Sequence, residues 1–119
     1  MPDAELRGIT LDCADPQALA IFYGELTGMR ELFSSEDYVA LTTDSGPALG
    51  FQRVEGYRAP NWPGQDVPQQ LHLDFRVDDL DEMVAQALRL GASEPDHEPG
   101  GERSRVLLDP AGHPFCLTS

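Results

Sequence analysis

The side chains best suited to chemistry stand at alternate positions in two separate stretches. His72, Asp74 and Arg76 form one series, and Thr10 and Asp12 form another near the N-terminus. Alternate residues of a β-strand point to the same face, so each series is expected on one side of a sheet. An imidazole beside a carboxylate is the arrangement of a general base and the group that orients it. The sequence therefore offers His72 as a candidate base and Asp74 as its partner.

The same residues also have a purely structural interpretation. His72 and Asp74 would then form a hydrogen-bonded interior pair. Arg76 would neutralise Asp12 or Asp74 from an adjacent strand, because buried charges need partners. Cys116 would be a small apolar side chain, and it becomes reactive only if a neighbour such as His72 activates the thiol. Both interpretations remain open at this point.

The elements that would position these residues occur twice along the chain. Residues 8–13 and 72–77 alternate apolar and polar side chains, which is the period of a half-buried strand. A capping Asp and a helix-period apolar face follow each of them, and each helix is expected to end at a Gly. The expected helical faces are Leu19, Ile21, Phe22, Tyr23 and Leu26, then Leu80, Met83, Val84, Ala87, Leu88 and Leu90.

Each expected helix is followed by a strand–turn–strand pattern. The strands are expected over 38–42, 48–52, 104–108 and 115–118, with weaker ones near 30–33 and 92–95. Each half therefore reads β-α-β-β-β, which predicts the α+β class and one domain over residues 1–119. The expected modules are 5–54 and 71–119, joined by a Pro-rich connecting loop over 55–70. Trp62 in that loop is interpreted either as a lid or as a dimer contact.

Two short motifs support a family resemblance. A Phe-Tyr-x-x-Leu-x-Gly helix end spans residues 22–28, and an Asp-Pro-x-Gly turn spans 109–112. In this order and spacing the chain resembles the vicinal oxygen chelate superfamily over nearly its whole length, and residues 49–74 look like its bacterial glyoxalase-like subgroup. The resemblance implies the glyoxalase/bleomycin resistance/dihydroxybiphenyl dioxygenase fold, in which the tandem modules form a curved eight-stranded mixed sheet with the helices outside.

The resemblance also allows a test for a metal. Metal-dependent relatives place one ligand on the first and one on the last strand of each module, and the repeat aligns Gly8 with His72 and Gly50 with Cys116. Divalent metals need His, carboxylate or thiolate groups, and glycine supplies none. Of these four residues, only His72 matches a ligand position well, and Cys116 is a possible soft ligand at a second position. A catalytic divalent metal is therefore disfavoured, with Asp12 and Asp74 on the inner face as the residues that could complete a site, and no other cofactor is expected.

The concave face is instead expected to bind a small molecule. Its predicted ligand-binding residues are Thr10, Asp12, Tyr38, Gln52, Trp62, Arg76 and Cys116. Gly8 and Gly50 are expected to leave room for part of the guest. The predicted function is a glyoxalase-like protein that binds a small organic molecule. The alternative is a metal-independent lyase, isomerase or hydrolase with His72 as general base, and a metal-dependent lyase or dioxygenase is disfavoured.

Composition limits the partners. The chain has 119 residues and a formal net charge of -13, and its eight basic residues are all Arg. The electrostatic field of a chain with this negative charge repels nucleic acid and anionic membranes. Neither is therefore an expected partner. An apolar run of about 20 residues, the length that spans a bilayer, is absent from the sequence. A cytoplasmic location, two unbonded cysteines and, by resemblance, a homodimer are expected.

Overall fold

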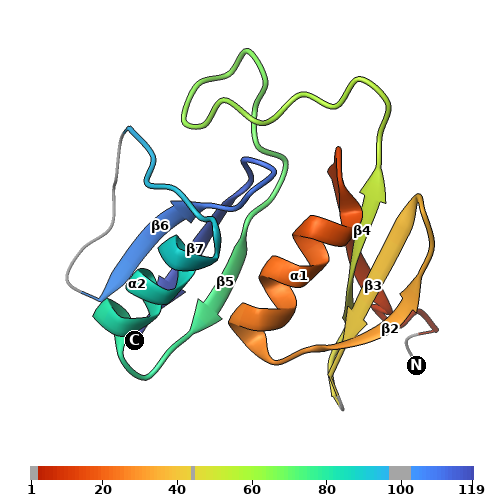
Figure 1. Ribbon diagram of the computed structural model, residues 1–119, viewed down its shortest axis with the longest axis horizontal. Coiled ribbons are helices and arrows are strands. Elements are labelled where there is room, and N and C mark those ends of the chain that lie inside the picture. Colours follow the sequence, from red (N-terminus) through yellow and green to blue (C-terminus); the bar gives the residue numbers. More distant parts are fainter. Residues whose placement is uncertain (1–2, 44, 97–102) are drawn as a thin grey trace. The chain divides into compact units, whose positions relative to one another are not determined.

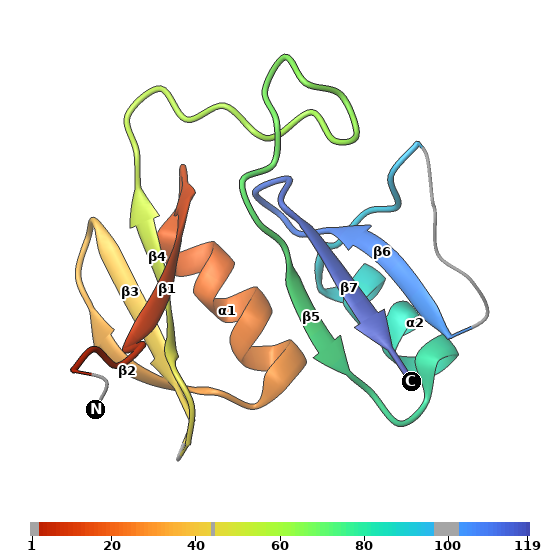
Figure 2. The same cartoon turned by 180° about the vertical axis from the view of Figure 1, so that it is seen from behind.

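The strand–helix order repeats twice in the computed structural model, which describes residues 3–43, 45–96 and 103–119. The chain divides into two compact units, unit 1 over Met1–Tyr57 and unit 2 over Arg58–Ser119. The division falls inside the predicted connecting loop. Figure 1 and Figure 2 show each unit as a small sheet with one helix against one face. A single functional domain over 1–119 stays a prediction.

Unit 1 has a four-stranded sheet covered by one helix. Its elements in chain order are β1 (Gly8–Cys13), α1 (Pro16–Thr27), β2 (Arg30–Ser34), β3 (Tyr38–Thr42) and β4 (Ala48–Arg53). The strand order is β1-β4-β3-β2, with β1 parallel to β4 and the other neighbours antiparallel. Helix α1 packs against β3 and β4, so the opposite face of these strands faces away from the helix.

The limits of α1 follow from its two caps. The Asp15 carboxylate accepts a hydrogen bond from the Ala18 backbone N–H at 3.1 Å. At the other end Gly28 adopts a left-handed conformation with φ 77, which glycine reaches without steric cost. The predicted helix over 16–27 is confirmed. Ile21, however, was wrongly assigned to the buried face, because its exposed fraction is 66%.

Aromatic packing between α1 and β4 forms the core of unit 1. Tyr23 and Phe51 are both fully buried, and their rings stack at 5.6 Å between centroids. Phe22 meets the Tyr23 ring edge-on at 4.9 Å. Burial of three aromatic rings at one contact fixes the helix on the sheet.

Unit 2 repeats the arrangement with three strands. Its elements are β5 (Leu73–Arg76), α2 (Leu80–Leu90), β6 (Ser104–Leu108) and β7 (Pro114–Thr118). The strand order is β5-β7-β6, with β5 parallel to β7 and β6 antiparallel to it. The Asp79 carboxylate caps α2 by accepting from the Glu82 N–H at 3.1 Å, and Gly91 ends the helix with φ 118.

The expected eighth strand is reduced to a single bridge. Between α2 and β6, the described residues 92–96 contribute only the pair Ser93 and Leu108, whose backbones exchange hydrogen bonds of 2.9 and 2.8 Å. Pro95 has no N–H to donate to a ladder, so pairing cannot continue through it. The described part of the chain thus has seven strands in two sheets. The eight-stranded curved sheet is shown only in part.

The pairing registers of the two sheets match, which supports the internal alignment used above. In unit 1 Thr10 lies opposite Gly50, and in unit 2 Asp74 lies opposite Cys116. The same register makes Tyr38 and Ser104 equivalent, as well as Gln52 and Thr118.

A buried Asp organises the turn between β6 and β7. Asp109 is 3% exposed, and its Oδ1 accepts hydrogen bonds from the backbone N–H groups of Ala111 at 2.8 Å and His113 at 3.0 Å. Gly112 has φ 89, and its N–H donates to the Asp109 carbonyl at 2.8 Å. The Asp-Pro-x-Gly motif is therefore a self-bonded turn that sets the start of β7, the strand that carries Cys116.

Candidate functional site

Each sheet has one face toward its helix and one polar face, as the alternation predicted. In unit 1 Leu11 and Phe51 are buried, whereas Thr10, Asp12 and Gln52 are exposed on the other side. In unit 2 the exposed residues of β5 are Asp74 and Arg76. These are residues that the sequence assigned to a site. That the two polar faces line one cavity stays a prediction.

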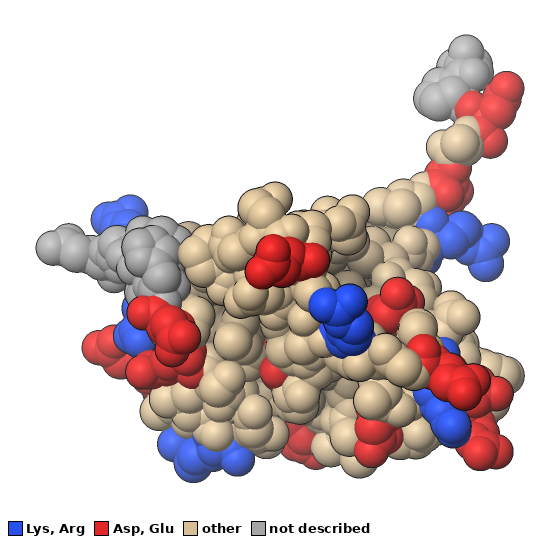
Figure 3. Space-filling model, turned by 90° about the horizontal axis from the view of Figure 1, so that it is seen from above, with Lys and Arg blue, Asp and Glu red and all other residues tan. Residues whose placement is uncertain are grey.

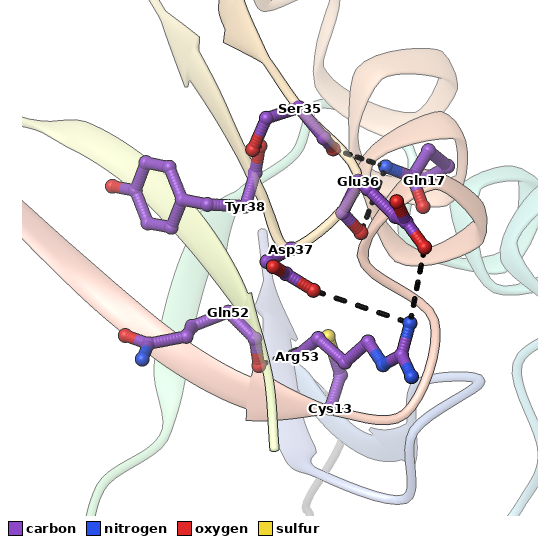
Figure 4. Close-up of polar contacts among 8 residues, drawn as sticks. All are labelled: Cys13, Gln17, Ser35, Glu36, Asp37, Tyr38, Gln52 and Arg53. Carbon is purple, nitrogen blue, oxygen red and sulfur yellow. Dashed lines mark hydrogen bonds and ion pairs between the residues drawn. The ribbon is translucent and has the colours of Figure 1, made fainter. Parts of the chain in front are cut away.

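An open hollow of about 570 Å³ lies at one end of β3 and β4 in unit 1. It is lined by Asp37, Tyr38, Gln52, Arg53 and Glu55. Figure 4 shows Tyr38 and Gln52 extending to the same side of the strands. These two were predicted to bind a ligand. The other three were missed, although a cluster of charged residues at adjacent strand ends is a signal that strand pairing could have revealed.

Arg53 supplies the positive charge at this hollow. Its Nη1 lies 3.8 Å from Glu36 Oε1 and 4.0 Å from Asp37 Oδ1, and half of the side chain is exposed. Figure 4 shows these ion pairs on the side away from the Tyr38 ring. Ion pairs of this length in contact with solvent are worth about 0–1 kcal/mol. The two carboxylates therefore hold the guanidinium only weakly.

Gly50 is not an empty place on the polar face, and that prediction was wrong. A Cβ added there would lie in contact with the Tyr38 hydroxyl, 2.7 Å from Tyr38 Cζ and 2.9 Å from Thr10 Oγ1. A side chain on β3 thus fills the space that the sequence left open on β4. Gly8 is also close to its neighbour, since its Cβ would stand 3.3 Å from the Ala48 carbonyl oxygen.

In unit 2 three potentially reactive side chains converge. His72 Nε2 lies 3.3 Å from Asp74 Oδ1, and the ligand atoms of His72, Asp74 and Cys116 all lie within 4.8 Å of one another. The predicted contact between imidazole and carboxylate is confirmed. The two side chains are 43% and 68% exposed, so the pair is not buried within unit 2 itself. We call these three residues the unit 2 cluster.

Arg76 does not pair with Asp74, and its pairing with Asp12 of unit 1 stays a prediction. Its Nη1 lies 3.0 Å from Asp78 Oδ1, and both side chains are almost fully exposed. The expected pairing with Asp74 was wrong. Asp74 and Arg76 lie on the same extended strand, where residues two apart are separated by a full pleat, whereas Asp78 follows the end of β5, where the chain is no longer held in a strand.

Trp62 is half-buried in the loop of unit 2, next to a cis peptide bond to Pro63. Its role as lid or dimer contact stays a prediction.

The donor set does not fit the four-ligand metal site that the resemblance implies. Gly8 and Gly50 offer no donor atom, and the group over Gly50 is a phenol from Tyr38. The unit 2 cluster supplies three donor types that metals accept, but all three come from one module. At the two positions that the repeat assigns to unit 1, neither Gly8 nor Gly50 can donate to a metal, and a metal-free protein stays a prediction.

The two cysteines are unbonded, as predicted. Cys13 is buried, and its thiol donates to the Gln52 carbonyl at 3.6 Å, whereas Cys116 is partly exposed.

Acidic side chains occur at several separate places on the face drawn in Figure 3, not in one patch. Neither α1 nor α2 has the length and apolar character needed to cross a membrane.

Comparisons with known proteins agree with this architecture. The family model of the glyoxalase-like domain matches residues 8–118. The chain is 31% identical, over an alignment of 109 positions that covers 86% of this chain, to a Mycobacterium bovis protein named "Putative glyoxylase CFP32", and it spans 39% of that relative's length.

Solved structures share the fold. A glyoxalase/bleomycin resistance protein/dioxygenase family enzyme from Burkholderia phytofirmans superposes with a TM-score of 0.74 at 23% identity, covering 96% of this chain and 97% of the other. The bleomycin-binding protein of Streptomyces verticillus, complexed with copper(II)-bleomycin, gives 0.60 at 18% identity over 100% and 98% of the two chains. With a repeated β-α-β unit in matched register and a family match across nearly all of it, the chain belongs to the glyoxalase-like domain family of the vicinal oxygen chelate superfamily.

Proposed function

We propose that this protein binds a small organic molecule on the polar faces of its sheets and that it needs no resident metal to do so. The observation that carries the proposal is the hollow at Tyr38 and Gln52, which combines an aromatic ring, an amide and charged groups. Polar groups that converge on a concave surface can fix the orientation of a small molecule, and the Tyr38 ring is the aromatic surface among them. The missing donors at Gly8 and Gly50 favour binding over metal chemistry.

The charges around the hollow favour a neutral or cationic ligand. Asp37 and Glu55 line it together with the single cation Arg53, which already faces two carboxylates. Asp12 adds a further acidic group on the same face of the sheet. Across a chain with a net charge of -13, an anionic ligand approaches against the field.

Native mass spectrometry of protein purified without added metal tests this proposal. Metal-free bleomycin, a cationic probe, should bind about tenfold more tightly than S-lactoylglutathione, an anionic one, and the difference should shrink at high salt. The two probes follow from relatives named for bleomycin binding and for lactoylglutathione lyase activity. The Gln52→Ala variant should lower bleomycin affinity several-fold.

Gln65→Ala is the matched control, because it removes an exposed amide whose only described hydrogen bond is to the adjacent Gly64 carbonyl. Equal losses in the two variants would count against the hollow. The same spectra, with added Zn²⁺, Ni²⁺, Mn²⁺ and Fe²⁺ followed by elemental analysis, report the metal content. A stoichiometric, tightly held ion would contradict the metal-free part of the proposal and favour a metal-dependent lyase or dioxygenase.

A second candidate function is metal-independent catalysis by the unit 2 cluster. The contact of 3.3 Å between His72 and Asp74 is the observation that favours it, because a carboxylate at that distance can orient an imidazole as a general base. The reaction would be that of a lyase, isomerase or hydrolase acting on the molecule that the protein binds.

His72→Ala separates catalysis from binding. If the cluster is catalytic, we expect kcat on the bound molecule to fall about 10²- to 10⁴-fold with an unchanged dissociation constant. Asp74→Asn should cause a smaller loss, since the imidazole remains. Arg76→Ala is the control on the same strand, because Arg76 pairs with exposed Asp78 and not with the cluster. A loss of affinity alone in His72→Ala would assign the cluster to binding.

We further propose a homodimer in the cytoplasm. Two unbonded cysteines are compatible with a reducing compartment, and the dimer is the expectation from the family. The native mass spectra measure the oligomeric state directly, and a monomer at all concentrations would contradict the dimer.

A further inference from the structure

Two hydroxyl groups meet over Gly50 on the polar face of unit 1. Tyr38 comes from β3 and Thr10 from β1, the two strands that flank β4 in the sheet. A Cβ at Gly50 would stand 2.9 Å from Thr10 Oγ1 and nearer still to the Tyr38 hydroxyl. The two oxygens thus both lie within 2.9 Å of one point above the middle strand.

At the equivalent positions of unit 2, the larger and the smaller side chain have exchanged strands. The register matches Gly50 with Cys116 and Tyr38 with Ser104. In unit 1 the middle strand has no side chain and its neighbour has a large one. In unit 2 the middle strand has a side chain and its neighbour has a small one. The absence of a side chain at Gly50 is therefore what admits the phenol.

The surroundings of the two hydroxyls are partly apolar. Phe33 on β2 lies in the same cross-strand row as Gly50, because it pairs with Ala40, which pairs with Gly50. Its ring centroid is 6.3 Å from that of Tyr38, and 54% of the residue is exposed. An aromatic wall beside two hydroxyls suits a ring that carries one polar oxygen.

We propose that Tyr38 and Thr10 form a two-hydroxyl site that hydrogen-bonds the carbonyl oxygen of a neutral, ring-bearing ligand, with Gly50 as the residue that allows it. The proposal rests on the proposed binding function and names the chemistry of the ligand. A carbonyl oxygen has two lone pairs and can accept from both hydroxyls at once. A carboxylate would meet the same donors but also the like charge of Asp12, which lies two residues along β1 from Thr10.

Benzamide and benzoate are matched probes, since both carry a benzene ring and differ in charge. The full chain is labelled with ¹⁵N, and the backbone amide shifts of Thr10, Gly50 and Gln52 are followed during titration. Benzamide should shift these amides, and benzoate should bind at least about fivefold more weakly. Shifts confined to residues outside unit 1 would overturn the proposal.

Three variants remove one part of the site each. Tyr38→Phe keeps the ring and removes the hydroxyl, and Thr10→Val removes the second hydroxyl at nearly constant volume. Each should weaken benzamide binding about three- to tenfold, the range that one hydrogen bond supplies. Gly50→Ala should cause a similar loss with both hydroxyls retained, because the new methyl group displaces the phenol. Unchanged binding in Tyr38→Phe and Thr10→Val would overturn the proposal.

Ser104→Ala is the matched control, because it removes a hydroxyl from the equivalent position of unit 2. Its dissociation constant for benzamide should lie within about twofold of that of the parent protein.

The geometry is tested without any ligand by nuclear Overhauser contacts between the Tyr38 ring and the Gly50 Hα atoms, and their absence would also overturn the proposal. If Gly50→Ala does not fold, the other two variants decide.

The two proposals can fail separately. Retained bleomycin binding without benzamide shifts at Gly50 would remove the two-hydroxyl site and leave the binding function. Failure of both probes would contradict the binding function itself.

Discussion

Replacing Tyr23 by Ala should destabilise the protein by about 3–5 kcal/mol, the range for removing a large aromatic side chain from a packed core. Tyr23 is fully buried between the helix and the sheet of unit 1, with Phe51 stacked on one side and Phe22 at its edge. Each ring loses a partner in the variant, and a cavity remains. Urea denaturation followed by far-ultraviolet circular dichroism measures the change.

Ile21→Ala is the control for this variant, since the residue is two positions away in the same helix. Its side chain is 66% exposed, so the same kind of truncation should change the free energy of unfolding by no more than about 0.5 kcal/mol. Similar losses from Tyr23→Ala and Ile21→Ala would mean that α1 does not bury the face assigned to it.

The second large effect is expected at Asp109. Asp109→Ala removes the acceptor of two backbone N–H groups in the turn before β7, and the loss of such charge-assisted hydrogen bonds in a buried place should cost about 2–4 kcal/mol. Because β7 carries Cys116, the turn also sets the position of the unit 2 cluster. The chemical shifts of residues in β7 should therefore change along with the stability.

Asp109→Asn keeps one acceptor oxygen and should lose less than half as much stability as the Ala variant. A free energy of unfolding within about 0.5 kcal/mol of the parent in Asp109→Ala would contradict the role given to the carboxylate. The turn would then be held by its backbone contacts alone, among them the hydrogen bond from the Gly112 N–H to the Asp109 carbonyl.

Local signals in the sequence were sufficient for the helices and most strands. Asp15 and Gly28 mark the ends of α1 because a capping carboxylate and a left-handed glycine act within one turn. Ile21 was misplaced because the six consecutive apolar residues 18–23 cover more than one helical turn at about 100° per residue, so they cannot all face the sheet. The pattern alone does not say which of them faces away.

The candidate site was predictable only where it depends on strand register. The internal repeat placed His72, Asp74 and Cys116 on one face of unit 2, and the structure brings them together. The contact between Tyr38 and Gly50 was not predictable, because it runs diagonally between two strands and depends on a side-chain rotamer. The ion pair of Arg76 with Asp78 likewise depends on how the chain turns after β5.

Above Gly50 the Tyr38 phenol occupies the place that the Cys116 side chain occupies in unit 2, and this difference affects how the two halves of a duplicated fold should be compared. An alignment of the two halves pairs Gly50 with Cys116 and therefore records no functional group at position 50. In space the volume above Gly50 is filled by the Tyr38 phenol from the neighbouring strand, so a functional group is present there although the aligned residue has no side chain. A comparison of aligned residues alone would therefore miss functional groups that reach a position from a neighbouring strand. A comparison of which atoms occupy the space above each aligned position would find them.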